Sequence, residues 1–402
     1  MSTTAGALRA LVAQPLWRRW TLAAFLARLP TTMTLLALVL AGEQATGSIA
    51  IGSLLAGVAT FTSGFAAPWR GRALDRREIR GGLQRASLAA AAAFTAQGVA
   101  LAVGAPVALL FVLAFVQGVA FAAISGGFRA LLPVVVPRED LARANALEAV
   151  FVEVAFVSGP AVAGVVALLT GPVGVLLAMA ASVAGAALVA RGLPPRHPVG
   201  GAAATVPPWR APGALPVYLL ALAMGVTVGM LESAVPARMD ELGLVSASAG
   251  FLLALVAGGS ALGGIVASLR GHGAEHARRR AALLLGAFAV LLAPTALTGS
   301  LLALALALFV TGVPIAPLNA LGAMVLQDAV PAGRQAEGFS VFIAAIMVGA
   351  GAGQALTGAV LGLVGAQGVL LAAAAVPLAA AVVLAIAPRA RSRERERVAV
   401  RV

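Results

Sequence analysis

The feature that most constrains this chain is an alternation of long apolar runs with short segments that hold most of its charge. The 402 residues are 61% hydrophobic and 11% charged, with a mean hydropathy of +0.99. A soluble domain carries about 25% charged residues. The 28 basic and 15 acidic side chains cannot cover a water-soluble chain of this length. Lipid must therefore be the main solvent.

Apolar runs of spanning length recur along the whole chain. A bilayer core about 30 Å thick needs about 20 apolar residues of helix, and a helix satisfies its own backbone hydrogen bonds in lipid, which an open sheet does not. We therefore predict an all-α integral membrane protein with twelve transmembrane helices. The predicted spans are 20–41, 47–69, 83–103, 106–127, 146–169, 172–190, 214–236, 248–269, 281–298, 301–322, 338–363 and 367–387.

The placement of Arg predicts the orientation. Every basic residue is Arg, and most lie in the N-terminal segment, in every second connection and in the tail. The other connections are short and carry Glu43, Asp240, Glu241 and a single Arg238. The positive-inside rule then places both termini in the cytoplasm of a multi-pass cell-membrane protein, with its loops against an anionic inner leaflet. Basic residues spread in this way argue against a nucleic-acid partner.

A long connection and an internal repeat divide the chain into halves. The segment 191–213 is rich in Pro, Gly and Ala, as a flexible or semi-extended connector would be. Residues 52–59 (GSLLAGVA) match residues 250–257 (GFLLALVA) at six of eight positions, which indicates a duplicated half. The predicted division is an N-terminal six-helix bundle at 1–190, a cytoplasmic linker at 191–213, a C-terminal six-helix bundle at 214–387 and a basic cytoplasmic tail at 388–402.

The connection after the second span reads GRALDRREIR, from Gly71 to Arg80. Gly71 permits a tight turn at the membrane surface. Asp75 precedes the third helix, where a carboxylate meets unpaired N–H groups. On residue types alone, a basic loop with one balancing acid explains this segment equally well.

This connection resembles the G-x-L-A-D-R-x-G-R-R signature of the major facilitator superfamily. The order at 73–74 is swapped, and Glu78 and Ile79 replace Gly and a base. The resemblance implies a cytoplasmic latch between the two halves that favours the outward-open state, weakened here by the changes at 78–79. The matching positions are Gly71, Asp75, Arg76 and Arg80.

The fifth span contains VSGPAVAG, which resembles the GPxxGG motif of the antiporter branch of that superfamily. Gly159, Pro160 and Gly164 match, and Ala163 replaces one Gly. The resemblance favours efflux. The alternative is a kink or a close-packing site, because small residues let helices approach closely.

Three charged residues lie deep inside predicted spans: Arg28, Glu153 and Glu232. A lone charge at such depth costs at least about 3 kcal/mol, so it needs a partner or water. We expect Arg28 and Glu153 to approach each other, either as a static ion pair or as a switchable one. Glu148 lies one turn inside the boundary, where we expect interfacial solvation to satisfy it.

A carboxyl group whose environment changes during transport can take up and release a proton. Glu153 and Glu232 are therefore the candidates for the coupling proton, and Arg28 is a further candidate for proton coupling or substrate binding. Pro314 and Pro317 in the tenth span are gate candidates, because proline interrupts a helix and lets it bend.

Other chemistry finds no support in the sequence. There is no Cys, and no phosphate-binding loop ending in Lys occurs. His272 and His276 have metal-ligand spacing, but Arg278 to Arg280 follow and oppose a cation. We predict no catalytic residue, no metal and no cofactor.

The sequence thus predicts a monomeric, proton-coupled exporter of a small amphipathic compound, working by alternating access. As the resemblance implies, helices 1, 4, 7 and 10 line its cavity. These helices have few polar groups, which favours an apolar or weakly cationic substrate. The alternatives are an importer or uncoupled facilitator on the same fold, and a non-transporting membrane sensor.

Overall fold

The computed structural model describes residues 10–75, 78–196, 208–211, 213–269, 277–330 and 335–386. Within these residues the chain is helical and contains no strand. The helices, in chain order, are α2 (Pro15–Thr46), α3 (Ile49–Asp75), α4 (Ile79–Ala102), α5 (Val107–Phe121), α6 (Ile124–Val135), α7 (Leu141–Ala190), α8 (Ala214–Glu241), α9 (Ala249–Leu269), α10 (Ala277–Leu292), α11 (Leu301–Gly312), α12 (Ile315–Ala329) and α13 (Gln335–Ile386).

These helices account for the twelve predicted crossings. In the described part of the chain, nine helical segments are long and apolar enough to cross a membrane. Two of them, α7 with 50 residues and α13 with 52, are long enough for two crossings each. The crossing not among these nine is α4, whose 24 residues extend about 36 Å.

A glycine turns the chain at the middle of both long helices. Gly171 in α7 has φ 70° and ψ −178°, and Gly365 in α13 has φ 66° and ψ 176°. Glycine adopts positive φ without the steric cost that a Cβ atom brings. The turns fall between the predicted fifth and sixth spans and between the eleventh and twelfth.

The fourth and tenth crossings are interrupted helices. The tenth breaks between α11 and α12, where Pro314 is the residue before the first turn of α12 and Pro317 lies within that turn. The fourth breaks between α5 and α6, where Ala123 has φ 67°. We did not predict this second break, because no proline marks it.

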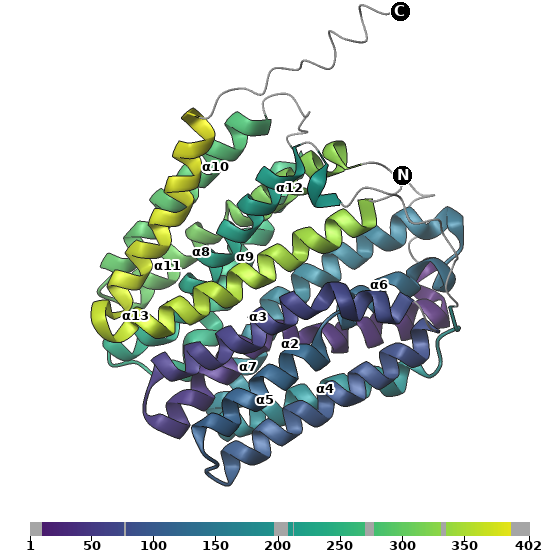
Figure 1. Ribbon diagram of the computed structural model, residues 1–402, viewed down its shortest axis with the longest axis horizontal. Helices are drawn as coiled ribbons and strands as arrows, with labels where there is room; N and C mark the ends of the chain where they lie inside the picture. The colour runs from purple at the N-terminus through teal and green to yellow at the C-terminus, as the bar shows by residue number, and fades with distance from the viewer. Residues whose placement is uncertain are drawn as a thin grey trace, which may run out of the picture.

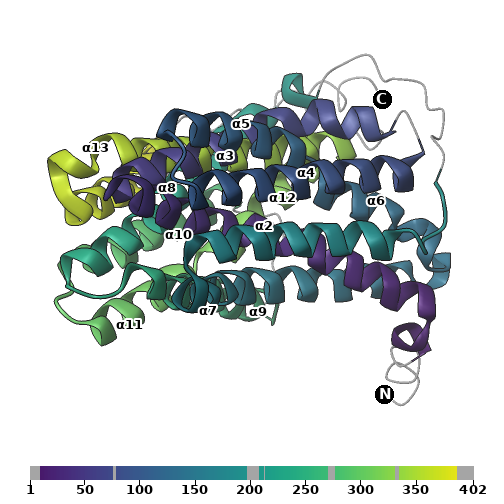
Figure 2. The same cartoon turned by 90° about the horizontal axis from the view of Figure 1, so that it is seen from below.

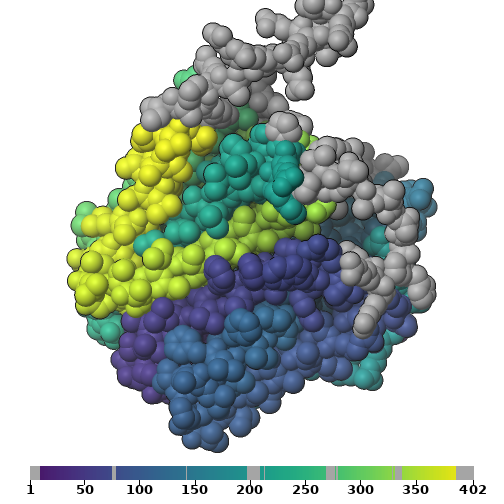
Figure 3. Space-filling model, viewed as in Figure 1, coloured from purple at the N-terminus to yellow at the C-terminus, as the bar shows by residue number. Residues whose placement is uncertain are grey.

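The helices form two groups that meet along a seam, and Figure 1 shows α3 and α13 side by side on it. The space-filling view has no gap between these two helices (Figure 3). Glycines allow the approach: a Cβ atom on Gly57 would lie 2.7 Å from the backbone nitrogen of Ala355, and one on Gly351 would overlap the backbone of Phe61. On the other side of the molecule α7 lies beside α9 (Figure 2).

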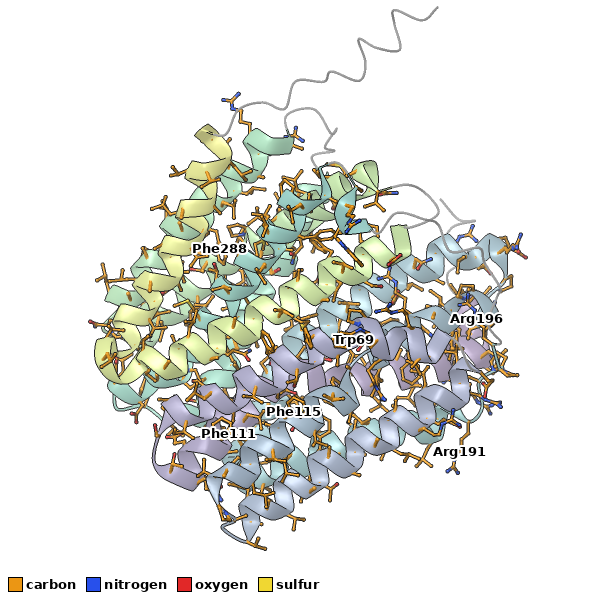
Figure 4. The ribbon with its side chains drawn as sticks, in the orientation of Figure 1. Trp69, Phe111, Phe115, Arg191, Arg196 and Phe288 are labelled. Atoms are coloured by element: carbon orange, nitrogen blue, oxygen red, sulfur yellow. The ribbon has the colours of Figure 1, made fainter. Side chains whose placement is uncertain are left out.

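We name the two ends of the molecule by their charge. The odd-numbered crossings begin at the Arg-rich end, where Figure 4 places Arg191 and Arg196; α3 and α9 begin at the Arg-poor end. One continuous buried core joins Val39 of α2 to Val235 of α8 and Leu252 of α9 at the Arg-poor end. Toward the Arg-rich end, α8 instead contributes to two clusters made of C-terminal residues alone. The core shared by the halves therefore lies at the Arg-poor end.

Two predictions about connections are wrong. Gly71 does not turn the chain, because α3 continues to Asp75 and places Gly71 inside a helix. Arg129, which falls in the predicted connection between the spans 106–127 and 146–169, lies in α6 because the fourth crossing extends to Val135. The described residues cover the predicted linker 191–213 only in part and leave out the tail 388–402.

Candidate functional site

The Gly-Pro motif of the fifth crossing lies where the halves touch. A Cβ atom on Gly159 would overlap the hydroxyl oxygen of Thr32 in α2. A Cβ atom on Gly164 would lie 3.3 Å from the Cα atom of Gly250 in α9, and one on Gly250 would overlap the carbonyl oxygen of Pro160. One side of the motif therefore packs against α2 of the same half, and another side packs against α9 of the other half.

Arg28 is paired, but not with Glu153. Its Nη2 atom lies 3.2 Å from Oε1 of Glu148. The other carboxylate oxygen, Oε2, lies 3.3 Å from Nε of Arg129 in α6. Glu148 is only 2% exposed. Our expectation that interfacial solvation satisfies Glu148 is therefore wrong as well.

The direction of side chains in a helix explains this choice of partner. α2 and the first half of α7 both begin at the Arg-rich end, and helical side chains lean toward the start of their helix. Arg28 therefore extends toward the Arg-rich end, where Glu148 lies about 7.5 Å closer than Glu153. Glu148 and Glu153 also point about 140° apart around α7, at 3.6 residues per turn.

Glu153 lies on the stripe of α7 that faces the other half. It precedes Pro160 by seven residues and Gly164 by eleven, so the three share one side of the helix. That side contacts Gly250 of α9 about 10 Å nearer the Arg-poor end. Glu153 is half-buried, no ion-pair partner for it exists among the described residues, and α9 carries no charged residue.

Glu232 lies on a different surface. It follows Gly225 by seven residues and Gly229 by three, and Cβ atoms on these two glycines would overlap the backbone of α13 at Ile346 and Ala350. Glu232 therefore shares the side of α8 that packs against α13. It is half-buried and has no ion-pair partner within the described part of the chain.

A polar contact joins the halves at the Arg-poor end. The hydroxyl group of Ser246, in the short helix η3 (Ser246–Ser248), donates a hydrogen bond of 3.2 Å to Oε1 of Glu43 in α2. A pocket opens beside this bond, and Gln44 and Pro172 also line it. From the sequence we had interpreted Glu43 as a marker of orientation and, at the 198-residue offset of the internal repeat, as the counterpart of Glu241.

Glu241, the counterpart of Glu43 in the second half, forms its hydrogen bonds within that half. Glu241 accepts a 2.6 Å hydrogen bond from the backbone nitrogen of Ala366 and a 2.8 Å bond from Arg238. Arg238 also donates to the carbonyl oxygen of Thr298 at 2.7 Å. These bonds tie the end of α8 to two neighbouring turns. Arg238 and Glu241 are three residues apart in the sequence, a spacing that allows an ion pair on one side of a helix. We did not predict this ion pair.

Only part of the predicted latch can be described. Arg76 and the side chain of Asp75 lie outside the described residues. Arg80 lies 3.5 Å from Glu78 in its own half and donates to the carbonyl oxygen of Leu193, at the start of the predicted linker. Glu78, which we had treated as a departure from the signature, begins α4 and accepts a 3.0 Å hydrogen bond from the nitrogen of Gly81. The helix-start role that we predicted for Asp75 lies outside the described residues, because its side chain is not among them.

The described residues contain no group of three metal-ligating side chains. His272 and His276 lie outside them.

The fold and this arrangement of charges define a multi-pass membrane protein of two six-helix bundles. The sequence profile of the Major Facilitator Superfamily matches residues 20–270 and again residues 217–401. The chain therefore belongs to the Major Facilitator Superfamily, as its resemblance implied. No curated protein matches the chain in sequence.

Solved structures share the fold at low sequence identity. A mutant of the nucleoside transporter NupG has a TM-score of 0.76 at 13% identity, over 92% of this chain and 99% of that one. A bacterial homologue of the human lysosomal transporter Spinster, in an inward-facing and occupied conformation, has a TM-score of 0.69 at 16% identity, over 94% of this chain and 96% of that one. Identities this low bear on the fold alone.

Proposed function

We propose that this chain is a secondary active transporter that exports a small amphipathic compound in exchange for protons, by alternating access. Family membership and the two-bundle fold support transport of a small molecule. Direction and coupling are the parts that need support from the site.

The observation that carries the proposal is the position of Glu153. Its carboxyl group lies on the stripe of α7 that contacts the other half, and no described residue neutralises it. When two bundles rock against each other, groups on this stripe exchange a packed environment for a water-accessible one. A carboxyl group exposed to such a change binds a proton in one state and releases it in the other.

The seam supports the same mechanism. Glycine contacts at Gly57 and Gly351, and at Gly164 and Gly250, provide two lines along which the halves can pivot. The shared core and the Glu43–Ser246 bond both lie at the Arg-poor end, which supports a state closed at that end. In this proposal Asp75 and Arg76 form a latch at the other end, and the break at Pro314 lets the tenth crossing bend.

The test begins with cells that lack or overproduce the protein, challenged with a panel of amphipathic compounds. A compound that changes resistance is then followed in proteoliposomes with an imposed pH gradient. Glu153→Gln and Glu232→Gln should lose the dependence of flux on the gradient. Glu139→Gln, at an exposed site in the short helix η1 (Arg138–Asp140), is the matched control and should keep it. If both test variants retain full gradient-driven flux, the coupling assignment is wrong.

Import or uncoupled facilitation is the alternative on the same fold. It predicts flux in the opposite direction, or flux that persists unchanged without a gradient, in the same proteoliposomes. The likeness to NupG, described as a nucleoside transporter, makes nucleosides a sensible addition to the panel.

A further inference from the structure

The ion cluster on α2, α6 and α7 carries a surplus positive charge. Each oxygen of the Glu148 carboxylate contacts a different guanidinium group, from Arg28 at 3.2 Å and from Arg129 at 3.3 Å. Two positive groups share one negative group. A surplus charge attracts water or a counter-ion, so one guanidinium group of the cluster can take a further anionic partner.

The geometry assigns that capacity to Arg129. The side chain of Arg28 is 12% exposed, whereas that of Arg129 is 66% exposed. Arg129 contacts Glu148 through Nε, and its two Nη atoms have no hydrogen-bond partner among the described residues. The two Nη atoms form a flat edge that matches two oxygens of a carboxylate or phosphate group.

The helix on either side of Arg129 is held in place. The indole N–H of Trp20 donates a 2.8 Å hydrogen bond to the carbonyl oxygen of Phe128, and Arg196 donates to the carbonyl oxygen of Ala130. Glu148 holds the Arg129 side chain through Nε. A guanidinium group that is already positioned loses less entropy when it binds a ligand than a free surface Arg does.

We propose that Arg129 is a binding site for the anionic group, a carboxylate or a phosphate, of an amphipathic molecule that reaches it from the Arg-rich end. An anion there would balance the surplus charge while its apolar part lies among the α2 and α6 side chains. If the bound anionic group belongs to the transported molecule, the expected substrate becomes anionic and not weakly cationic. This part of the inference rests on the proposed function and deepens it. The phosphate of an anionic lipid headgroup has the same chemistry.

Removing the Arg129 charge should leave the fold intact. In Arg129→Gln the buried Glu148 carboxylate keeps its 3.2 Å partner Arg28, so no buried charge becomes unpaired. Arg138→Gln is the matched control, because Arg138 is an exposed Arg of the same segment of the chain, in η1. Both variants lose one positive charge, but only Arg129→Gln removes a member of the ion cluster.

The experiment measures binding, not transport, on the purified full-length chain in a non-ionic detergent. One arm titrates hexyl phosphate and hexanoate, with hexanol as the uncharged control. A second arm measures phosphatidylglycerol adducts, against phosphatidylcholine, by native mass spectrometry. Because neither arm requires a pH gradient, failure of this proposal and failure of proton-coupled export are separate results.

The wild type should bind hexyl phosphate at least tenfold more tightly than Arg129→Gln, with Arg138→Gln within twofold of the wild type and hexanol binding unchanged. A several-fold loss of phosphatidylglycerol adducts in Arg129→Gln alone, without binding of the soluble anions, would support the site and identify a lipid as its ligand. If Arg129→Gln matches Arg138→Gln in both arms, the proposal is overturned.

Discussion

Ser246 and Glu43 connect the two halves of the protein by a hydrogen bond of 3.2 Å at the Arg-poor end. The internal repeat pairs Glu43 with Glu241, yet the two acids act differently. Glu241 has Arg238 three residues before it, whereas the residue three before Glu43 is Leu40. Without an Arg in its own turn, the Glu43 carboxylate is available to accept a bond from the other half. We expect this bond to favour closure of the Arg-poor end.

Removing either partner should open the Arg-poor end more often. The chain has no Cys, so a single Leu40→Cys substitution in the adjoining pocket provides a clean reporter. A hydrogen bond to a charged group contributes about 1.5 kcal/mol, which corresponds to roughly tenfold in population. Thiol labelling of the reporter should therefore rise up to about tenfold in Glu43→Ala and in Ser246→Ala. Unchanged labelling in both would contradict this role.

Gly250 should tolerate no side chain. A Cβ atom there overlaps the carbonyl oxygen of Pro160, so Gly250→Ala must push α9 away from α7. Overpacking of this kind costs about 1–3 kcal/mol. Gly286→Ala in α10 is the control, because no atom lies within 4 Å of the added methyl group. Thermal unfolding in detergent should show a lower Tm for the first variant and no decrease for the second.

Glu148 and Glu153 should differ in their effect on stability. Glu148→Gln leaves the enclosed Arg28 without its partner, a change that typically costs about 3 kcal/mol or more. Glu153→Gln removes a carboxyl group that has no ion pair in the described structure and should leave the Tm nearly unchanged. Parallel thermal unfolding of the two variants checks this, and equal losses would argue against the ion cluster as described.

Ala123 should be improved by glycine. Its φ of 67° places a Cβ atom where an L-residue is disfavoured, at a cost of about 1 kcal/mol or more. Ala123→Gly should therefore raise stability by about 1 kcal/mol. Ala89→Gly, at an exposed position within α4, should lower it by about 0.5–1 kcal/mol. A decrease for both variants would mean that the break between α5 and α6 is not strained.

Several features follow from the sequence alone, because they depend on local rules. Apolar runs of spanning length predict the helices, since each helix partitions into lipid largely on its own composition. The positions of the turns at Gly171 and Gly365 were also predictable, because polar or flexible residues must lie between runs of that length. Family membership follows from a motif and from the repeat, both of which are readable along the chain.

Only the tertiary structure decided which charged groups meet. Arg28 pairs with Glu148 and not with Glu153 because the choice depends on the height and the rotation of α7 against α2. The same holds for the bond between Ser246 and Glu43, and for the exposed guanidinium edge of Arg129. Rotation of a transmembrane helix about its axis is set by close contacts such as Gly164 against Gly250. Hydropathy along the chain carries no information about those contacts, because lipid-facing and buried positions are equally apolar.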